Sequence, residues 1–189
     1  LTDGLTAALE ISGSSGGVPF ENARVRGSAI LIDTTAGGGD DIVTVYGADN
    51  SHTNTSLLIT TGGQAGDVVN VDGTTTFSGT VTIHAARVHL NASITNGVAG
   101  TATTVNVTSP GQIQDGIDVA APGGTVKVAA GTYAEHLVLA KQLTLEGAQA
   151  GVDARGRVGD ESTITATSGT LLTLQNGSAG SVIDGFTFL

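Results

Sequence analysis

Apolar and polar residues alternate in short runs along most of this sequence. Every second residue is Val or Ile in runs such as TVTIH (80–84) and TVKV (125–128). This is the period of a β-strand, in which successive side chains point to opposite faces. Gly, Asn, Asp and Ser cluster between the runs, as turns require. The pattern therefore predicts strands over 9–12, 23–25, 29–33, 41–45, 56–60, 67–71, 80–84, 88–91, 104–107, 125–128, 137–139, 143–146, 162–166, 171–175 and 182–188.

The predicted strands recur at a spacing of twenty-odd residues. Strand starts at 9, 30, 57, 81 and 104 lie 21, 27, 24 and 23 residues apart, and 30–47 aligns with 57–73 after one gap. Leu143, Ile164 and Phe186 are separated by 21 and 22 residues. Such a repeat predicts a parallel β-helix, whose coils rise by about 4.8 Å. An antiparallel sandwich also has strands at intervals of roughly 8–12 residues, but it needs no repeat of this kind.

One segment departs from the strand pattern. Over 111–121, Ile113, Ile117 and Ala120 fall at helical spacing, Pro110 suits a helix start, and Pro122 with two glycines ends it. We therefore expect an all-β fold, a right-handed parallel β-helix (β-solenoid), with one short capping helix near 111–121. This helix would cover the end of the coils that begin at Thr125.

Composition and charge narrow the possible partners and location. The chain has 7 Lys and Arg against 17 Asp and Glu, a formal net charge of −10, and no cluster of basic residues that could neutralise phosphates. No stretch approaches the roughly 18 apolar residues of a membrane-spanning helix. We expect no nucleic-acid partner and no membrane insertion. Cysteine and methionine are both absent, which favours a secreted or cell-surface location, in a bacterium.

A family resemblance covers about 104–147, and residues 109–147 carry its pattern. They read SPGQIQDGIDVAAPGGTVKVAAGTYAEHLVLAKQLTLEG, which resembles the opening of the right-handed parallel β-helix in the pectin lyase-like superfamily, including pectinesterases. SVIDGFTF (181–188) is similar to a later coil of that group. The stretch AGGGDDIVTVYGAD (36–49) instead resembles repeats of large bacterial surface and adhesin-like proteins.

The resemblance implies two segments. We expect a β-solenoid repeat segment over 1–103, followed over 104–189 by the start of a pectin lyase-like β-helix. The last residues, Phe186-Thr187-Phe188-Leu189, read as the middle of a strand with no polar cap. We therefore expect both ends to continue in a longer protein, with a β-helix truncated at the C-terminus.

Catalysis in the pectinesterase group implies two aspartates with a nearby arginine on adjacent coils. The group's Asp-Phe-Ile-Phe-Gly motif is absent; Asp184-Gly185-Phe186 only echoes it, and no second aspartate is expected at the same phase one coil earlier. We expect no catalytic residue in this chain. The active coils of an enzyme would lie beyond Leu189.

Glycine and aspartate also form a candidate calcium motif. GGGDD (37–41) resembles half of a calcium-binding nonapeptide repeat, and Gly66-Asp67 recurs 26 residues after Asp41. If calcium binds, Asp40, Asp41 and Asp67 are the expected ligands. The alternative is that these residues only shape and solvate corners. We expect no other cofactor.

Three further residues are candidates for a binding surface. Tyr133 could form a sugar-stacking platform, or it could cover the first rung of the β-helix with its hydroxyl at the rim. Arg155 and Arg157 lie in the long polar stretch 150–162, which we expect to protrude as a binding loop or as a self-neutralising solvated loop.

These observations lead to three alternative functions. The first is a structural or adhesive segment of a large bacterial surface protein, a stalk, fibre or binding rod, whose partner is carbohydrate or another copy of the chain. The second is the N-terminal part of a carbohydrate-active enzyme. The third is a calcium-dependent binding module.

Overall fold

The structure is a computed structural model, and it describes residues 8–12, 16–20, 29–35, 39–50 and 56–189. The expected all-β class is confirmed. The described residues form strands β1 to β21, one α-helix, α1 (Ile113–Val119), and one short 3-10 helix, η1 (Ala154–Gly156). All strand pairs among them are parallel.

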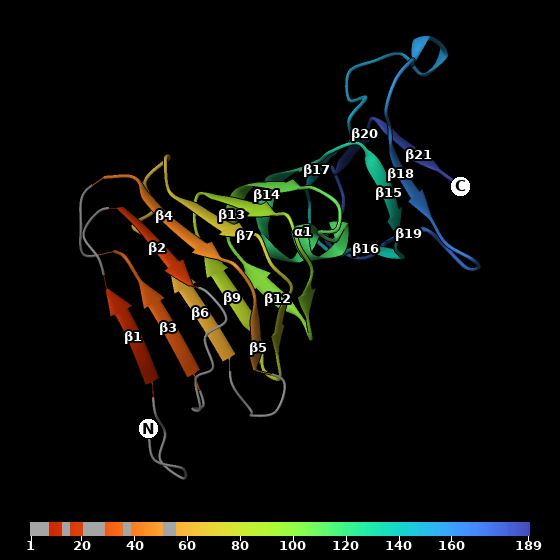
Figure 1. Ribbon diagram of the computed structural model, residues 1–189. Coiled ribbons are helices and arrows are strands. Elements are labelled where there is room, and N and C mark those ends of the chain that lie inside the picture. The colour runs from red at the N-terminus through yellow and green to blue at the C-terminus, as the bar shows by residue number, and fades with distance from the viewer. Residues whose placement is uncertain (1–7, 13–15, 21–28, 36–38, 51–55) are drawn as a thin grey trace.

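Five parallel sheets make up the fold (Figure 1). An eight-stranded sheet, called the long sheet below, contains β2 (Gly16–Phe20), β4 (Asp41–Val45), β7 (Val68–Val71), β10 (Arg87–Leu90), β13 (Ala102–Val107), β14 (Ala120–Val128), β17 (Thr144–Glu146) and β20 (Val182–Asp184). A five-stranded sheet contains β1 (Ala8–Ser12), β3 (Ala29–Asp33), β6 (Ser56–Thr60), β9 (Val81–His84) and β12 (Val98–Gly100).

Three smaller sheets complete the described strands. The first three-stranded sheet contains β5 (Ala48–Asn50), β8 (Thr75–Phe77) and β11 (Ile94–Thr95). The second contains β15 (Gly131–Ala134), β18 (Ser162–Thr165) and β21 (Phe186–Phe188). A two-stranded sheet pairs β16 (Leu137–Leu139) with β19 (Leu172–Leu174).

The chain visits the sheets in a repeating order. Strands β3, β4 and β5 belong to the five-stranded, long and first three-stranded sheets, and β6 to β8 and then β9 to β11 repeat that order. After α1, the chain visits the long, second three-stranded and two-stranded sheets as β14, β15 and β16, and again as β17, β18 and β19. Each new strand therefore pairs with the equivalent strand of the previous repeat.

Register confirms part of the spacing seen in the sequence. Ile30 pairs with Leu57, and Leu57 pairs with Val81, as the repeat predicted. The next step was wrong: Val81 pairs with Val98, not with a residue at 104. The reason is a short coil, because the connections from β9 to β12 are only 85–86, 91–93 and 96–97.

The series through Leu143, Ile164 and Phe186 was also wrong. Ile164 on β18 pairs with Tyr133 and Phe188. Leu143 lies just before β17, which belongs to the long sheet and not to the sheet of β18. Irregular corners change the length of successive coils, so equal spacing in sequence does not guarantee equal position in a sheet. Which residues are equivalent in successive coils therefore follows from the strand pairs and not from the spacing in the sequence.

Most predicted strands are present, with three kinds of difference. The strand expected at 23–25 lies outside the described residues. Six short strands were not expected: β2, β5, β8, β11, β12 and β15. The single strand expected over 182–188 is divided at Gly185, whose φ of +81° disfavours other residues and whose added Cβ would overlap the Ala150 backbone.

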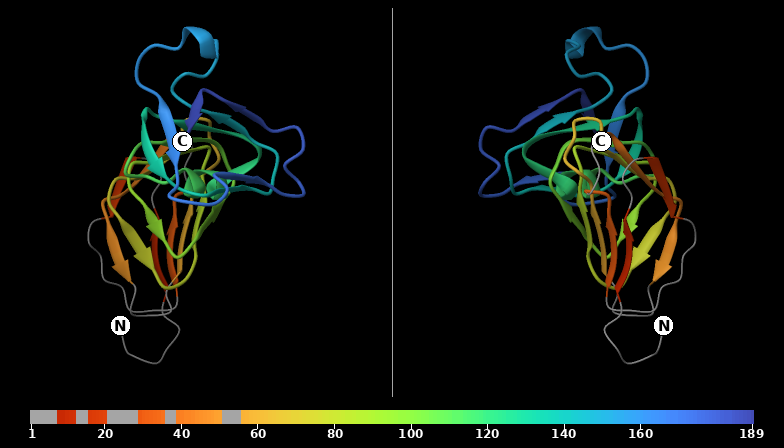
Figure 2. Two further views of the ribbon diagram at one scale, coloured as in Figure 1. Left: turned by 90° about the vertical axis from the view of Figure 1, so that its right-hand side faces the viewer. Right: turned by 90° about the vertical axis from the view of Figure 1, so that its left-hand side faces the viewer.

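Side chains on the inner faces of the sheets form one apolar core. In the long sheet, Val43, Val69, Val88, Val105 and Val126 lie in register on successive strands, and all are fully buried. Burying one such side chain is worth about 1.5–3 kcal/mol relative to leaving it exposed. Figure 2 views the molecule from its two ends, with the strands of the different sheets on different sides. The core therefore extends from strand to strand along the stack.

The helix α1 begins and ends within the segment predicted to be helical. It lies where the five-stranded and first three-stranded sheets have their last strands, while the long sheet continues past it (Figure 1). Its Gly116 packs against the long sheet, and an added Cβ would lie 2.8 Å from Val107 Cγ2 and 3.1 Å from Val126 Cγ1. The glycine that weakens the helix is therefore required for its close packing. The expected boundary between 1–103 and 104–189 falls inside β13 and stays a prediction.

A search of the described helices found none that is both long enough and apolar enough to cross a membrane.

Candidate functional site

A row of polar side chains follows the outer face of the long sheet. Asn106 pairs with Lys127, and Lys127 pairs with Glu146. All three alternate with buried neighbours such as Val105 and Val126, so they point away from the core. Because strands in a sheet lie about 4.8 Å apart, the row presents an amide, an ammonium and a carboxylate at regular intervals. The rigid sheet beneath fixes these positions.

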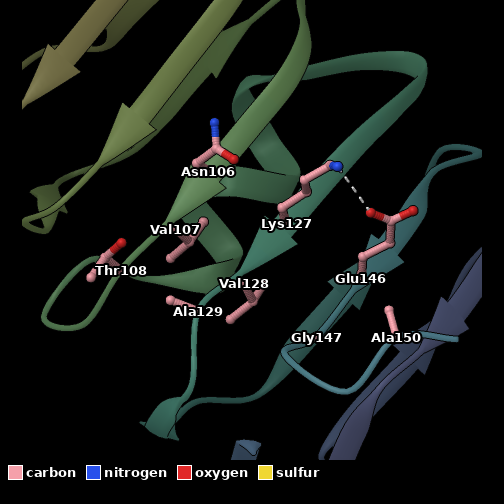
Figure 3. Close-up of a pocket in the computed structure, with 9 residues that line it drawn as sticks. All are labelled: Asn106, Val107, Thr108, Lys127, Val128, Ala129, Glu146, Gly147 and Ala150. Atoms are coloured by element: carbon pink, nitrogen blue, oxygen red, sulfur yellow. Dashed lines mark ion pairs between the residues drawn. The ribbon is translucent and has the colours of Figure 1, made fainter. Parts of the chain in front are cut away.

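This row forms part of an open pocket (Figure 3). The pocket has a volume of about 290 Å³ and is lined by Asn106, Val107, Thr108, Lys127, Val128, Ala129, Glu146, Gly147 and Ala150. Lys127 Nζ lies 3.4 Å from Glu146 Oε2, and the two side chains are 56% and 36% exposed. An exposed ion pair of this kind adds at most about 1 kcal/mol to stability. Its charged groups are therefore available to a ligand at little cost.

The turn after β17 forms one side of the pocket. Gly147 donates a hydrogen bond to Asp184 O at 2.8 Å, and an added Cβ at Gly147 would overlap Gly185 O. Ala148 N donates to Ser162 Oγ at 2.8 Å. These contacts fix the turn against the following coil, so this side of the pocket is held by backbone geometry.

The polar row continues with a second carboxylate. Glu146 on β17 pairs with Asp184 on β20. A carboxylate therefore does lie in register with Asp184, on the neighbouring strand of the long sheet. The sequence search missed it because it looked for an aspartate. Asp184 Oδ2 accepts from Gly151 N at 2.7 Å, and Asp184 Oδ1 lies 3.5 Å from Arg157 Nη2.

Tyr133 is a core residue with a bonded hydroxyl. It is 3% exposed, and its hydroxyl donates to Ala129 O at 2.9 Å. Burial raises its pKa above the ordinary value. These contacts favour the structural interpretation of Tyr133, because a buried ring presents no open face to a sugar.

The two candidate arginines have different environments. Arg155 is exposed over 90% of its side chain and pairs with Asp153 at 2.7 Å, within the protruding segment seen in Figure 1. Arg157 is only 14% exposed and donates to Phe186 O at 3.1 Å and Val152 O at 3.3 Å. Arg157 therefore ties the segment to β21, and the two side chains do not form one site.

The candidate calcium ligands lie at one corner of the fold, between the five-stranded and long sheets. Asp67 is buried, and its two oxygens accept hydrogen bonds from Asp41 N at 2.9 Å and Gln64 N at 2.8 Å. Asp41 is also buried. Asp40 is exposed, and its carboxylate occupies the space that a Cβ on Gly66 would fill. Asp67 therefore acts as a corner residue that links two coils.

Asp40, Asp41 and Asp67 do not form a metal-holding group, and metal-ligating side chains gather nowhere else in the described part of the chain. No group of three or more His, Cys, Asp or Glu side chains in those residues could hold a metal ion. Calcium binding by Asp40, Asp41 and Asp67 stays a hypothesis.

The sequence analysis missed a set of polar residues around α1. Glu135 accepts from Ile113 N at 2.8 Å and from Gln114 N at 2.9 Å. At the other end of the helix, Lys141 Nζ donates to Asp118 O at 3.0 Å and Ala120 O at 2.6 Å. The sequence carries a signal for the first contact, since Glu135 follows Tyr133 at strand period in the GTYAE motif.

Comparisons of this chain with protein-family models, with curated proteins and with solved structures found no match.

Proposed function

We propose that this chain is a structural and binding segment of a secreted or cell-surface bacterial protein, and that the outer face of its long sheet binds polysaccharide. The row of Asn106, Lys127 and Glu146 along an open pocket carries this proposal. Amide, ammonium and carboxylate groups supply the donors and acceptors that sugar hydroxyls require. The sheet fixes the backbone from which these side chains extend before the ligand arrives, which reduces the entropy lost on binding.

The architecture that we propose is a right-handed parallel β-helix of the pectin lyase-like kind. Three features support it: the repeating order of sheets, the parallel pairing of equivalent strands, and the columns of buried Val and Ile side chains. In such a rod the row on the long sheet runs parallel to the axis. An extended polysaccharide could then contact several coils at once.

Binding to immobilised polysaccharides tests the proposal. A panel of neutral, acidic and amino polysaccharides is incubated with the full chain and with the variants Asn106→Ala and Lys127→Ala. Losing one hydrogen bond of about 1 kcal/mol should weaken binding about fivefold. Thr82→Ala on β9, an outward position of the five-stranded sheet, is the matched control and should bind normally. Binding to no polysaccharide, or equal weakening by the control, would contradict the proposal.

Self-association is the competing use of the same face. A fibre formed through the long sheet would bury Lys127, and Lys127→Ala would then change particle size in light scattering in the absence of any sugar. Under our proposal, particle size stays the same in both variants.

A second candidate function is supported by one observation. Glu146 and Asp184 are in register on neighbouring strands, and Arg157 lies 3.5 Å from Asp184, as in the paired carboxylates and arginine of a carbohydrate-active enzyme. Both carboxylates are already engaged, Glu146 with Lys127 and Asp184 with Gly151 N, so binding remains our first choice. Release of reducing ends from an acidic polysaccharide, abolished by Glu146→Gln, would favour the enzyme instead.

A further inference from the structure

A buried carboxylate on α1 accepts a backbone hydrogen bond from an edge strand, at a place where a further strand could pair. Asp115 is 6% exposed, and its Oδ2 accepts a hydrogen bond from Ile94 N at 3.0 Å. Ile94 belongs to β11, an edge strand that pairs only with β8 among the described strands. The helix therefore closes the edge of the first three-stranded sheet with a side chain instead of a further strand.

The rest of α1 is held by side chains from the following coil. Glu135 binds the first amides of the helix, Lys141 binds its last carbonyls, and Gln114 Oε1 accepts from Val138 N at 2.8 Å. Gln112, the N-cap residue just before α1, makes no capping hydrogen bond with its side chain. Burial of Ile113, Ile117 and Val119 in the core seats α1, and the polar contacts add to it. Among the described contacts, Asp115 makes the side-chain hydrogen bond to β11.

The charges facing Asp115 are mainly negative. Asp118 lies on α1 itself, and Glu135 lies between β15 and β16. Lys141, between β16 and β17, faces Asp118 and binds the C-terminal end of the helix. Arg87, His89 and Lys127 lie on β10 and β14, at outward positions of the long sheet, opposite to the face that Gly116 contacts. The described residues of β11 and β12 carry no charged side chain.

We infer that α1 is a proton-linked latch: Asp115 takes up a proton while the helix is docked, so the helix is held more tightly in mildly acidic solution. The geometry allows this at Asp115, because among the described residues Oδ2 accepts the one hydrogen bond found for this carboxylate. Oδ1 can carry the proton while Oδ2 continues to accept from Ile94. Glu135 cannot do the same without loss, since both of its oxygens accept backbone hydrogen bonds.

The pKa of Asp115 agrees with this inference. This pKa is raised to about 6, chiefly by burial; the charges of Glu135 and Asp118 also raise it, and the hydrogen bond from Ile94 lowers it. A carboxyl with a pKa raised in the docked state contributes stability below its ordinary value of 3.8, and this contribution is lost as the pH rises through about 6. Burial also raises the pKa of Asp118 and Glu135, so their effects have the same sign.

Hydrogen exchange on the full chain tests the latch. After correction for the intrinsic exchange rate, the amides of Ile94, Ile113 and Gln114 should be about tenfold better protected at pH 5 than at pH 7, relative to the amides of β7. Asp115→Asn keeps an acceptor for Ile94 but cannot titrate, so its protection ratio should fall well below that of the unaltered protein, and what remains comes from Asp118 and Glu135. Asp160→Asn, an exposed carboxyl in the loop, is the matched control and should keep the full ratio.

Two results would overturn the latch: equal protection at both pH values in the unaltered protein, or a full ratio in Asp115→Asn. Should that variant fail to fold, carboxyl ¹³C NMR on the unaltered protein decides the question. An Asp115 signal that titrates near pH 6 supports the latch, and one that titrates near pH 4 rejects it.

Discussion

The carboxylate of Glu135 accepts a hydrogen bond at 2.8 Å from the backbone nitrogen of Ile113, a residue 22 positions earlier in the chain. With its other oxygen, Glu135 binds Gln114 N. A short helix of this length has little stability of its own, and its first amides have no partners inside the helix. The position of Glu135 in GTYAE is therefore explained by a structural task, the start of α1.

Replacing Glu135 should loosen the helix. Glu135→Ala leaves two partly buried amides without an acceptor, so we expect a loss of about 1–3 kcal/mol in the free energy of unfolding, measured by urea titration. Glu135→Gln keeps one acceptor oxygen and should lose less. A Glu135→Ala variant as stable as the unaltered protein would show that water replaces the carboxylate without cost.

Gly116 offers a second test of how α1 packs. Gly116→Ala should destabilise the protein by about 1–3 kcal/mol, because the new methyl group would press on Val107 and Val126. This effect opposes the gain in helix propensity of about 1 kcal/mol that alanine normally brings. Gly156→Ala in η1 is the control: nothing lies within 4 Å of its added Cβ, and its thermal midpoint should not change. A stabilised Gly116→Ala would refute close packing at this position.

The sequence predicted the strands well and the corners poorly. Alternation of Val and Ile identifies a strand such as β9 because the buried face determines which residues are tolerated. It cannot predict that Val81 pairs with Val98, since that depends on the short connections 85–86, 91–93 and 96–97 between β9 and β12. Short strands such as β11 contain too few residues to show a period. The polar row on the long sheet was missed for a related reason: Asn106, Lys127 and Glu146 become neighbours only once the register is known.

The contrast between two arginines leads to a prediction about the protruding segment. Arg157→Ala removes hydrogen bonds to Phe186 O and Val152 O from a largely buried guanidinium, so we expect residues 150–161 to be cleaved faster in limited proteolysis. The free energy of unfolding should fall by about 1–2 kcal/mol. Arg155→Ala is the matched control, because its side chain is paired with Asp153 and lies in solvent. Equal cleavage of the two variants would show that the hydrogen bonds of Arg157 do not protect this segment from cleavage.

Asp67 should be sensitive to the loss of a single oxygen. In Asp67→Asn, either Asp41 N or Gln64 N faces an amide donor instead of an acceptor. We expect a loss of about 1–3 kcal/mol, measured by urea unfolding. Asp40→Asn, an exposed position at the same corner, should be nearly neutral. A neutral Asp67→Asn would mean that the corner repacks around the amide.

A calcium titration distinguishes the two interpretations of this corner, a calcium site or aspartates that only shape the turn. Both oxygens of Asp67 already accept backbone hydrogen bonds, so each has only one further lone pair to offer an ion. We therefore expect the thermal midpoint to be the same in millimolar calcium and in EDTA. A ligand present at 100 times its dissociation constant stabilises the folded state by about 2.7 kcal/mol, which a melt detects easily. A calcium-dependent rise that disappears in Asp41→Asn would establish the calcium-binding module and reject the purely structural role of these aspartates.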